Sequence, residues 1–270
     1  MPIRRSPNHP PQPAQARSRP GRLAVISANL WHDWPRFRRW PARLEALAQL
    51  VETERADVVL LQEVARTRAL HSDEWLADRL EMHCLYGRAN GHAGAIGFGE
   101  GVAVLSRFPL GQPRLHQFRS RANPFVRRVA LGTIVATPDG PMAAVSLHLS
   151  LLPRDNARQL AALPGWVSRL AGAGPAVVGG DFNAPEHRRG IGQARAFWLD
   201  TFRHLHPQAA GATHELRWPW GKTWRSQRLD YIFLQPGRQP WTVLEARHLE
   251  TPGGRHSDHK AVVARLAPQA

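Results

Sequence analysis

Short apolar runs separated by polar turns recur along this chain, and their lengths are typical of buried β-strands. These runs predict strands at residues 23–28, 57–63, 102–106, 129–137, 142–148, 175–179, 228–234, 242–248 and 259–266. Pro138-Asp139-Gly140 has the composition of a tight turn, so the strands on either side of it are expected to pair as a hairpin. Many strands with few helices between them predict two packed sheets flanked by helices, an α/β (α+β) fold.

Helical spacing of apolar residues appears between the first two strands, where Leu44, Leu47, Leu50 and Val51 predict a helix over residues 41–54. Further helices are expected at residues 73–82, 154–170 and 192–202. The glycine-rich stretch at residues 87–101 is expected to be a loop, because glycines and turn residues dominate it.

Composition divides the chain into a short tail and one domain. Residues 1–22 are rich in Pro, Arg, Gln and Ser and predict a disordered basic tail, whereas residues 23–270 are expected to form a single catalytic domain. Cys84 is the only cysteine, which excludes an intramolecular disulfide and a multi-cysteine zinc site. No apolar run approaches the roughly 18 residues needed to span a bilayer, and no secretory-type apolar stretch begins the chain. We therefore expect a cytoplasmic monomer without an integral membrane segment.

The charge is strongly positive, at +15 with a sequence pI of about 11.6. Lys222 and Lys260 are the only lysines among 36 basic residues, so arginine supplies nearly all of the positive charge. An arginine bias of this kind has two interpretations: the coding composition of a genome, or the binding of polyanions, whose phosphates guanidinium groups grip bidentately. The basic balance favours an anionic substrate or partner.

Polar residues follow the carboxyl ends of several predicted strands. They are Asn29, Glu63, His148, Asp181 and Asn183. A carboxylate at the end of a buried strand is costly unless it is paired, and hard divalent cations such as Mg²⁺ take oxygen ligands of this kind. Each residue taken alone is equally explained by a turn cap, but five such positions together favour one shared site.

An ordered series of motifs covers residues 23–267. The motifs are Ser27-Ala28-Asn29-Leu30-Trp31, Leu61-Gln62-Glu63-Val64, the run from Gly101 to Pro109, Ser146-Leu147-His148-Leu149, Gly179-Gly180-Asp181-Phe182-Asn183-Ala184-Pro185, Arg228-Leu229-Asp230-Tyr231 and Ser257-Asp258-His259. Taken together they resemble the metal-dependent endonuclease/exonuclease/phosphatase superfamily, which includes pancreatic-type deoxyribonuclease and neutral sphingomyelinases. The resemblance implies a four-layered α/β sandwich and hydrolysis of a phosphoester by in-line attack of water.

The resemblance also implies a metal site. Glu63 is its principal ligand, with Asn29 beside it and Asp258 near the same ion. The cofactor implied is Mg²⁺, with Mn²⁺ as the alternative, and its role is to neutralise the phosphate and the leaving oxygen.

The same resemblance assigns the catalytic roles. His259 contacts the scissile phosphate and is held in its tautomer by Asp230. Asp181 aligns or deprotonates the attacking water, and Asn183 orients the phosphate or Asp181. His148 matches a second phosphate-binding histidine. Glu100, just before the strand predicted at residues 102–106, is either a partner of His148 or an ordinary loop acid.

Two mixed Arg and Trp clusters are expected to rim this site. One contains Trp31, Trp34 and Trp40 with Arg36, Arg38 and Arg39, and the other contains Trp218, Trp220 and Trp224 with Arg217, Arg225 and Arg228. Such mixtures suit base stacking beside phosphates or a lipid headgroup interface, and they are equally explained by tryptophans packed under loops. By resemblance, Thr223 and Trp224 are expected to face the substrate. Arg127 and Arg128 begin a predicted strand and are expected either to contact a phosphate or to be ordinary surface arginines.

Three functional hypotheses follow from these observations. The first is a Mg²⁺-dependent nuclease acting on nucleic-acid phosphodiesters, favoured by the basic charge. The second is a phospholipid or small-molecule phosphodiesterase or phosphatase, similar to sphingomyelinase. The third is a catalytically silent polyanion-binding module. His148 and Val64 argue against abasic-site repair, since repair enzymes of this family usually carry other residues there.

Overall fold

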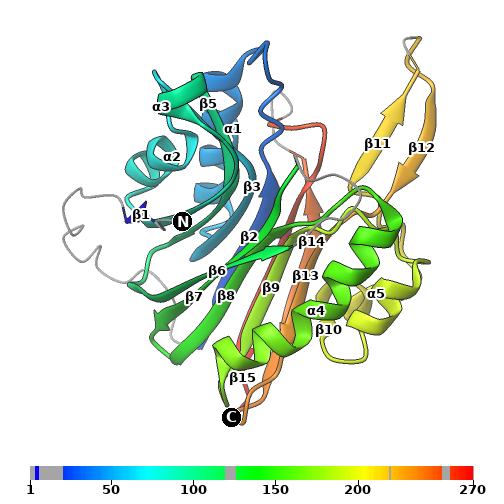
Figure 1. The fold of residues 1–270 in the computed structure, drawn as a ribbon. Coiled ribbons are helices and arrows are strands. Elements are labelled where there is room, and N and C mark those ends of the chain that lie inside the picture. Colours follow the sequence, from blue (N-terminus) through cyan, green and yellow to red (C-terminus); the bar gives the residue numbers. More distant parts are fainter. Residues whose placement is uncertain (1–3, 6–20, 119–125, 219, 251–255, 270) are drawn as a thin grey trace.

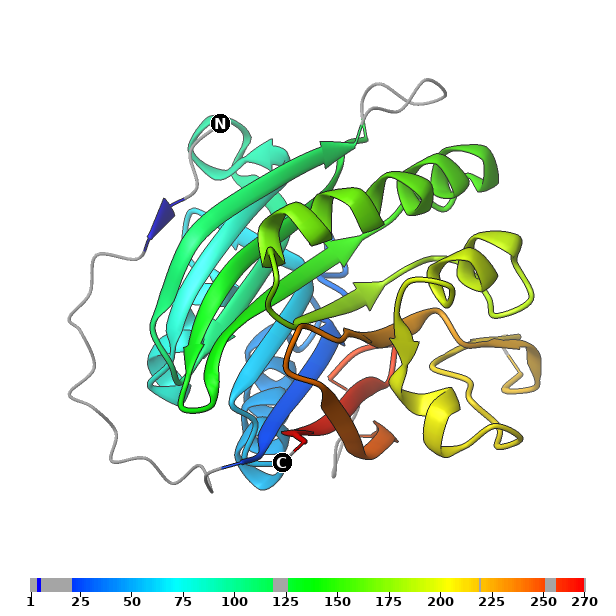
Figure 2. The same cartoon turned by 90° about the horizontal axis from the view of Figure 1, so that it is seen from below.

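Two β-sheets pack face to face, and helices cover the outer face of each sheet (Figures 1 and 2). The structure is a computed structural model, and it describes residues 4–5, 21–118, 126–218, 220–250 and 256–269. The order of layers is helix, sheet, sheet, helix, so the α/β sandwich of four layers expected from the sequence is confirmed.

The first sheet has seven strands in the described part of the chain, of which the outermost is very short. Their spatial order is β1 (Arg4–Arg5), β4 (His83–His92), β5 (Phe98–Ser106), β3 (Val58–Thr67), β2 (Leu23–Asn29), β15 (Ala261–Pro268) and β14 (Trp241–Leu249). β2 and β3 run parallel, and the other neighbours are antiparallel.

The second sheet has six strands among the described residues. Their order is β10 (Leu199–Asp200), β13 (Asp230–Gln235), β9 (Ala176–Asp181), β8 (Gly140–His148), β7 (Arg128–Thr137) and β6 (Leu110–Phe118). β8 and β9 run parallel, and the other pairs are antiparallel. A separate hairpin of β11 (His214–Arg217) and β12 (Thr223–Gln227) projects from one end of the sandwich (Figure 1).

Six helices lie in the described residues. They are α1 (Trp40–Thr53), α2 (Ser72–Leu80), α3 (Ala93–Ile96), α4 (Pro153–Ala171), α5 (Arg189–Ala194) and α6 (Thr201–Leu205). α1 and α2 pack on the outer face of the first sheet, where Leu47 contributes to a buried cluster with Leu61. α4 and α5 pack on the second sheet, where Leu163 lies among Val178 and Phe233. None of these helices is long and apolar enough to cross a membrane.

The core between the two sheets is largely apolar, and a short hydrogen-bonded chain crosses it. Gln62 Nε2 donates to Ser146 Oγ over 3.1 Å, and Ser27 Oγ donates to Gln62 Oε1 over 3.4 Å. Ser146 Oγ in turn donates to the Leu61 carbonyl over 2.8 Å. β2 and β3 belong to the first sheet and β8 to the second, so this chain joins the sheets at Gln62, which precedes Glu63 and pairs with Asn29 across the two strands. Buried polar groups satisfied in this way hold the two sheets in one register.

The loop predicted at residues 87–101 is wrong. β4 and β5 continue through it as a long antiparallel pair that encloses α3. The glycines serve close packing here, because a Cβ placed on Gly101 would lie 2.2 Å from the Gly87 carbonyl oxygen. Glycine composition predicted a loop because it cannot distinguish a flexible turn from a close approach of two backbones.

Three other elements depart from the pattern. The helix expected at residues 192–202 is instead α5 followed by β10, and α6 begins at Thr201. β6 was not predicted, because it is an edge strand that contains Pro113 and is mostly only half-buried. The β11–β12 hairpin has no apolar run and was also missed. Of the predicted tail, residues 1–3 and 6–20 lie outside the described residues, while Arg4–Arg5 pairs with β4.

We expect the stability of the protein to fall between pH 7 and pH 5 partly through His248. Its ring stacks on Phe202 with ring centroids 4.0 Å apart, and burial lowers the pKa of His248 to about 4. The unfolded imidazole, with a pKa of about 6.5, takes up a proton in this range while the folded one does not. The free energy of unfolding should therefore fall by roughly 2 kcal/mol on this account. Chemical denaturation at both pH values should show a smaller fall in His248→Phe, and an equal fall in both proteins would contradict the assignment.

Candidate active site

Polar side chains from both sheets meet at one end of the sandwich. β2 runs parallel to β3 and β8 parallel to β9, so the carboxyl ends of these strands lie on the same side. Asn29 ends β2, His148 ends β8 and Asp181 ends β9, while Asp230 begins the antiparallel β13. This placement explains why residues far apart in the sequence share one site.

His148, Asp181 and Asp230 form one row across three neighbouring strands. Asp181 is the backbone partner of His148 on one side and of Asp230 on the other. Side chains paired in this way point to the same face of a sheet. His148 Nε2 accordingly lies 3.5 Å from Asp181 Oδ2, and all three residues are buried.

A β-bulge aims Glu63 into the site. The pairing of β3 with β5 shifts register between Leu61 and Val64, and Glu63 adopts a left-handed φ of 50°. Bulges of this kind redirect a side chain at the end of a strand. The Asn29 side-chain nitrogen donates to Glu63 Oε1 and to Asp181 Oδ2, each over 3.2 Å, and thereby links the two sheets.

His259 is held by a short chain of hydrogen bonds. Its Nδ1 lies 2.8 Å from Asp230 Oδ2, and Thr213 Oγ1 donates to the same oxygen over 2.6 Å. Its Nε2 lies 4.0 Å from Asp181 Oδ2. Burial alone lowers the pKa of His259, but the carboxylates of Asp230 and Asp181 outweigh burial and raise the pKa to about 10. His259 is therefore an imidazolium at neutral pH, with its Nε2 proton directed toward the site.

The carboxylates of the site repel one another. Burial raises the pKa of Glu63 to about 7, and Glu100, Asp181 and Asp258 add to the effect. Burial also raises the pKa of Asp181 to about 6, with a contribution from Asp230. Repulsion of this kind is relieved when a divalent cation binds, and oxygen donors with an imidazole suit Mg²⁺ or Mn²⁺. Ligand atoms of Asp181, Asp230 and His259 all lie within 4.8 Å of one another and form a candidate metal-binding group. His259 can act as a ligand in this group only as the neutral imidazole, because an imidazolium has no free lone pair.

His148 lies between opposite charges. Arg128 Nη1 is 3.0 Å from His148 Nδ1, and Glu100 Oε1 is 3.9 Å from the same nitrogen. Burial and the Arg128 guanidinium hold the pKa of His148 well below its usual value, so the ring is neutral. The proximity of Glu100 to His148 agrees with its interpretation as a partner of His148.

The structure brings eight of the predicted site residues to this end of the sandwich. They are Asn29, Glu63, His148, Asp181, Asn183, Asp230, Asp258 and His259. Asn183 has a left-handed φ of 48°, and its backbone N–H donates to Asp181 Oδ1 over 2.9 Å. Its side-chain nitrogen donates to the Leu149 carbonyl over 3.0 Å. Asn183 therefore fixes the rotamer of Asp181.

The three predicted substrate-binding residues lie outside this cluster. Arg127 is exposed, and its backbone N–H donates to Asn90 Oδ1, whereas its neighbour Arg128 is the arginine that contacts His148. Thr223 and Trp224 are exposed on the projecting β12. The Trp224 ring packs near Trp218, with ring centroids 5.9 Å apart.

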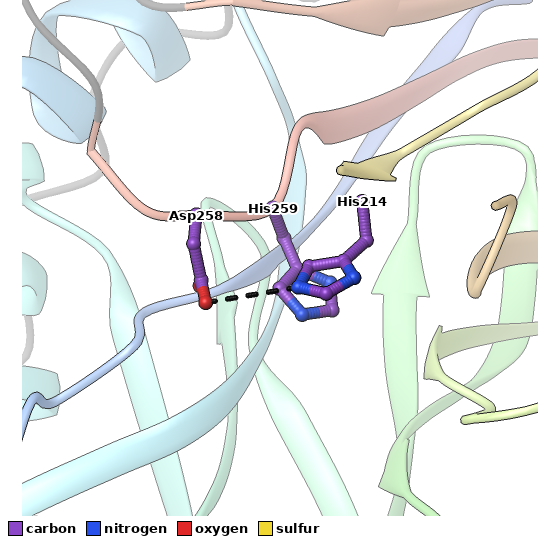
Figure 3. Close-up of side chains that lie close together, drawn as sticks. All are labelled: His214, Asp258 and His259. Atoms are coloured by element: carbon purple, nitrogen blue, oxygen red, sulfur yellow. Dashed lines mark ion pairs between the residues drawn. The ribbon is translucent and has the colours of Figure 1, made fainter. Parts of the chain in front are cut away.

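Sequence reasoning missed two histidines of the site. His214, on β11, has its ring centroid 4.4 Å from that of His259, and its Nε2 is 3.8 Å from Asp258 Oδ2 (Figure 3). Burial opposes ionisation of Asp258, but His214 and His259 hold its pKa below the usual value. His32 Nε2 lies 3.7 Å from Glu63 Oε2. The position of His32, three residues after Asn29, could have indicated that it belongs to the site. Nothing in the sequence around His214 indicated this.

The family model for "Endonuclease/Exonuclease/phosphatase family" matches residues 26–259 of this chain. The chain belongs to the endonuclease/exonuclease/phosphatase family. As a member of this family, it has a phosphoesterase fold with a candidate buried metal site. The function expected from the motif series is thus confirmed at the level of the family.

Individual relatives are more distant. YbhP of Escherichia coli, an uncharacterized protein, is 30% identical over 179 residues, which is 59% of this chain and 66% of YbhP, slightly less than two thirds of its length. A family member from Beutenbergia cavernae shares the fold with a TM-score of 0.74 at 23% identity, covering 93% of this chain and 72% of that one. D. rerio TDP2, solved in complex with a single-strand DNA product, gives a TM-score of 0.74 at 17% identity, covering 91% and 98%. At these identities, each of the two solved structures shows only that it shares its fold with this chain.

We expect Thr213→Val to lower the free energy of unfolding, because the substitution removes the hydrogen bonds that the Thr213 hydroxyl makes beside the site. Besides its bond to Asp230, Thr213 Oγ1 accepts the backbone N–H groups of Leu229 and Asp230 over 3.0 and 3.1 Å. Valine has a similar shape but leaves these buried groups unpaired, which costs about 1–3 kcal/mol. Thr213→Ser keeps the hydroxyl and serves as the control. Equal losses of unfolding free energy in the two variants would show that the methyl group, rather than the hydrogen bonds, matters.

Proposed function

We propose that this protein is a divalent-metal-dependent phosphodiesterase that acts on nucleic acid. The observation that carries the proposal is the pairing of an acceptor and a donor 4.0 Å apart: the Asp181 carboxylate and the His259 imidazolium. Glu63 adds a third ionisable group, whose pKa burial and the neighbouring carboxylates raise to about 7. Paired groups of opposite character at a site with perturbed pKa values are typical of acid–base catalysis.

Glu63, Asn29 and Asp258 are the residues that would hold Mg²⁺, with Mn²⁺ as the alternative. The donor set fits, because it consists of oxygen atoms from two carboxylates and one amide. The Asn29 oxygen accepts the Trp31 backbone N–H over 2.9 Å and retains a second lone pair for a cation. When bound, the ion supplies positive charge to the phosphate and to the leaving oxygen.

Asp181 is the proton acceptor for the attacking water in this proposal. Its pKa of about 6 leaves it ionised at neutral pH and close to the value at which a general base is most effective. Asn29 and Asn183 each hold one of its oxygens, so the carboxylate has a fixed orientation.

Two groups would bind the phosphate oxygens opposite Asp181. His259 directs its Nε2 proton into the site, and Asp230 holds the other ring nitrogen. Neutral His148 stands beside the Arg128 guanidinium and adds a second binding position. Donors fixed before the reaction stabilise the charge that develops on the phosphate.

The basic charge of +15 supports nucleic acid as the substrate, and the DNA complex of TDP2 shows a protein of the same fold with such a ligand. A second candidate is a phospholipid. It is favoured by the exposure of Trp220 and Leu151, whose side chains are 71% and 70% accessible. Exposed aromatic and aliphatic side chains beside arginines suit a headgroup interface as well.

We expect the purified protein to nick supercoiled plasmid in Mg²⁺ and to lose this activity in EDTA. His259→Ala and Asp181→Asn should each lower the rate by at least about 100-fold, because each removes a positioned proton-transfer or charge-stabilising group. Gel assays of initial rates give the measurement.

Matched controls are available on the surface. Asp78 on α2 and His204 on α6 are exposed, so Asp78→Asn and His204→Ala should keep the wild-type rate. A loss below about tenfold in His259→Ala would overturn its role. Hydrolysis of phospholipid vesicles without plasmid nicking would replace nucleic acid with the second candidate.

A further inference from the structure

A cavity of about 330 Å³ opens beside the active site and shares Asn183 with it. The first turn of α4, the start of α5 and strand β12 enclose it. Its volume falls within the range of pockets that bind small ligands. Because Asn183 also holds Asp181, a molecule in this cavity lies next to the reacting group.

Arginines dominate the charge of this cavity. Arg188, Arg189 and Arg225 line it, and no acidic side chain does. All three are exposed, and none of them makes an ion pair with any residue that the structure describes. We call this cavity the arginine pocket.

Nearby arginines behave differently. Arg195, Arg203 and Arg228 all contact Glu186 at 2.6–2.9 Å, and Arg195 and Arg228 also contact Asp200. The two carboxylates balance two of the three positive charges within the protein, and the shared ion pairs connect the segments that carry these arginines. The three arginines of the arginine pocket therefore carry positive charge that the described part of the fold leaves uncompensated.

The N-terminus of α4 adds to the positive potential. Pro153, Asn156 and Ala157 of its first turns line the arginine pocket, and the N-cap residue Leu152 supplies no side-chain cap. α4 is 19 residues long, and the first backbone N–H groups of such a helix favour a negative charge, part of which buried Asp155 in the first turn already supplies. This contribution supports the arginines and does not replace them.

We propose that the arginine pocket is a second phosphate subsite, which binds the phosphate next to the one being hydrolysed. This inference rests on the proposed function. Guanidinium groups match phosphate oxygens bidentately, and the wall shared through Asn183 places the two phosphates on one substrate. The protein then prefers substrates with a second phosphate on one side of the scissile bond. Two sources supply it: a neighbouring phosphodiester of a strand, or a terminal phosphomonoester.

Short thymidine oligomers test the arginine pocket and distinguish these sources. TpT contains only the scissile phosphate, TpTpT adds a phosphodiester, and pTpT and TpTp add a phosphomonoester on either side. Cleavage of the internal bond, followed by chromatography, should show kcat/KM about tenfold or more above that of TpT for at least one extended substrate. The triple variant Arg188→Ala, Arg189→Ala, Arg225→Ala should lose this preference and keep the TpT rate.

Arg169→Ala is the control for the loss of a surface arginine elsewhere. Arg169 is exposed in the last turn of α4, at the opposite end of the helix from the arginine pocket, and its loss removes one positive charge, against three in the triple variant. It should leave the preference intact. Equal kcat/KM for all four oligomers in the wild type, or a preference that survives in the triple variant, overturns the subsite while the proposed function stands.

A binding measurement separates failure of the subsite from failure of the proposed function. If the wild type cleaves none of the oligomers, the proposed function fails, and fluorescence anisotropy of labelled octathymidylate in EDTA tests the arginine pocket alone. The triple variant should bind about tenfold more weakly than Arg169→Ala. The slope of log K against log salt should also fall by about 0.7 for the lost phosphate contact. Equal affinities and equal slopes would overturn the subsite.

Discussion

Repulsion between carboxylates buried where the two sheets meet is the constraint on which the rest of this site depends. Glu63 and Asp181 come from different sheets, and both have raised pKa values because burial and neighbouring acids oppose their ionisation. The surrounding side chains act against this repulsion: Asn29 donates to both carboxylates, and His259 carries a positive charge beside Asp181. The donors present fix the positions of the acids but leave net negative charge, which is the condition under which a divalent cation binds.

Two sets of hydrogen bonds, one between the sheets and one at the rim, hold these groups in place. The chain from Ser27 through Gln62 to Ser146 joins the sheets directly beneath the site. On the rim, buried Arg43 of α1 donates to the carbonyl oxygens of Trp31 and His256, so that it connects the loop after β2 with the loop that carries Asp258 and His259. Precise placement of catalytic groups requires supporting contacts of this kind.

The arginines, which give the chain its charge, have two different roles. Some are structural: Arg66 pairs with buried Asp73, and Arg228 pairs with Asp200 and Glu186. Others, at the arginine pocket, have no acidic partner in the described part of the chain. A net charge indicates attraction to polyanions, but only the distribution of partners shows where an anion meets uncompensated charge.

The sequence by itself determined the sandwich and most of the site residues. Short apolar runs specify buried strands, and the polar residues that follow them, such as Asn29 and Asp181, mark the strand ends where a site forms. The tertiary structure alone decided the strand character of residues 87–101, the approach of His214 to His259 and the convergence of Arg188 with Arg225. Each of these features depends on contacts between residues far apart in the chain. The pattern of apolar and polar residues in a segment indicates its conformation and which of its side chains are buried. Which segments come into contact depends on tertiary packing.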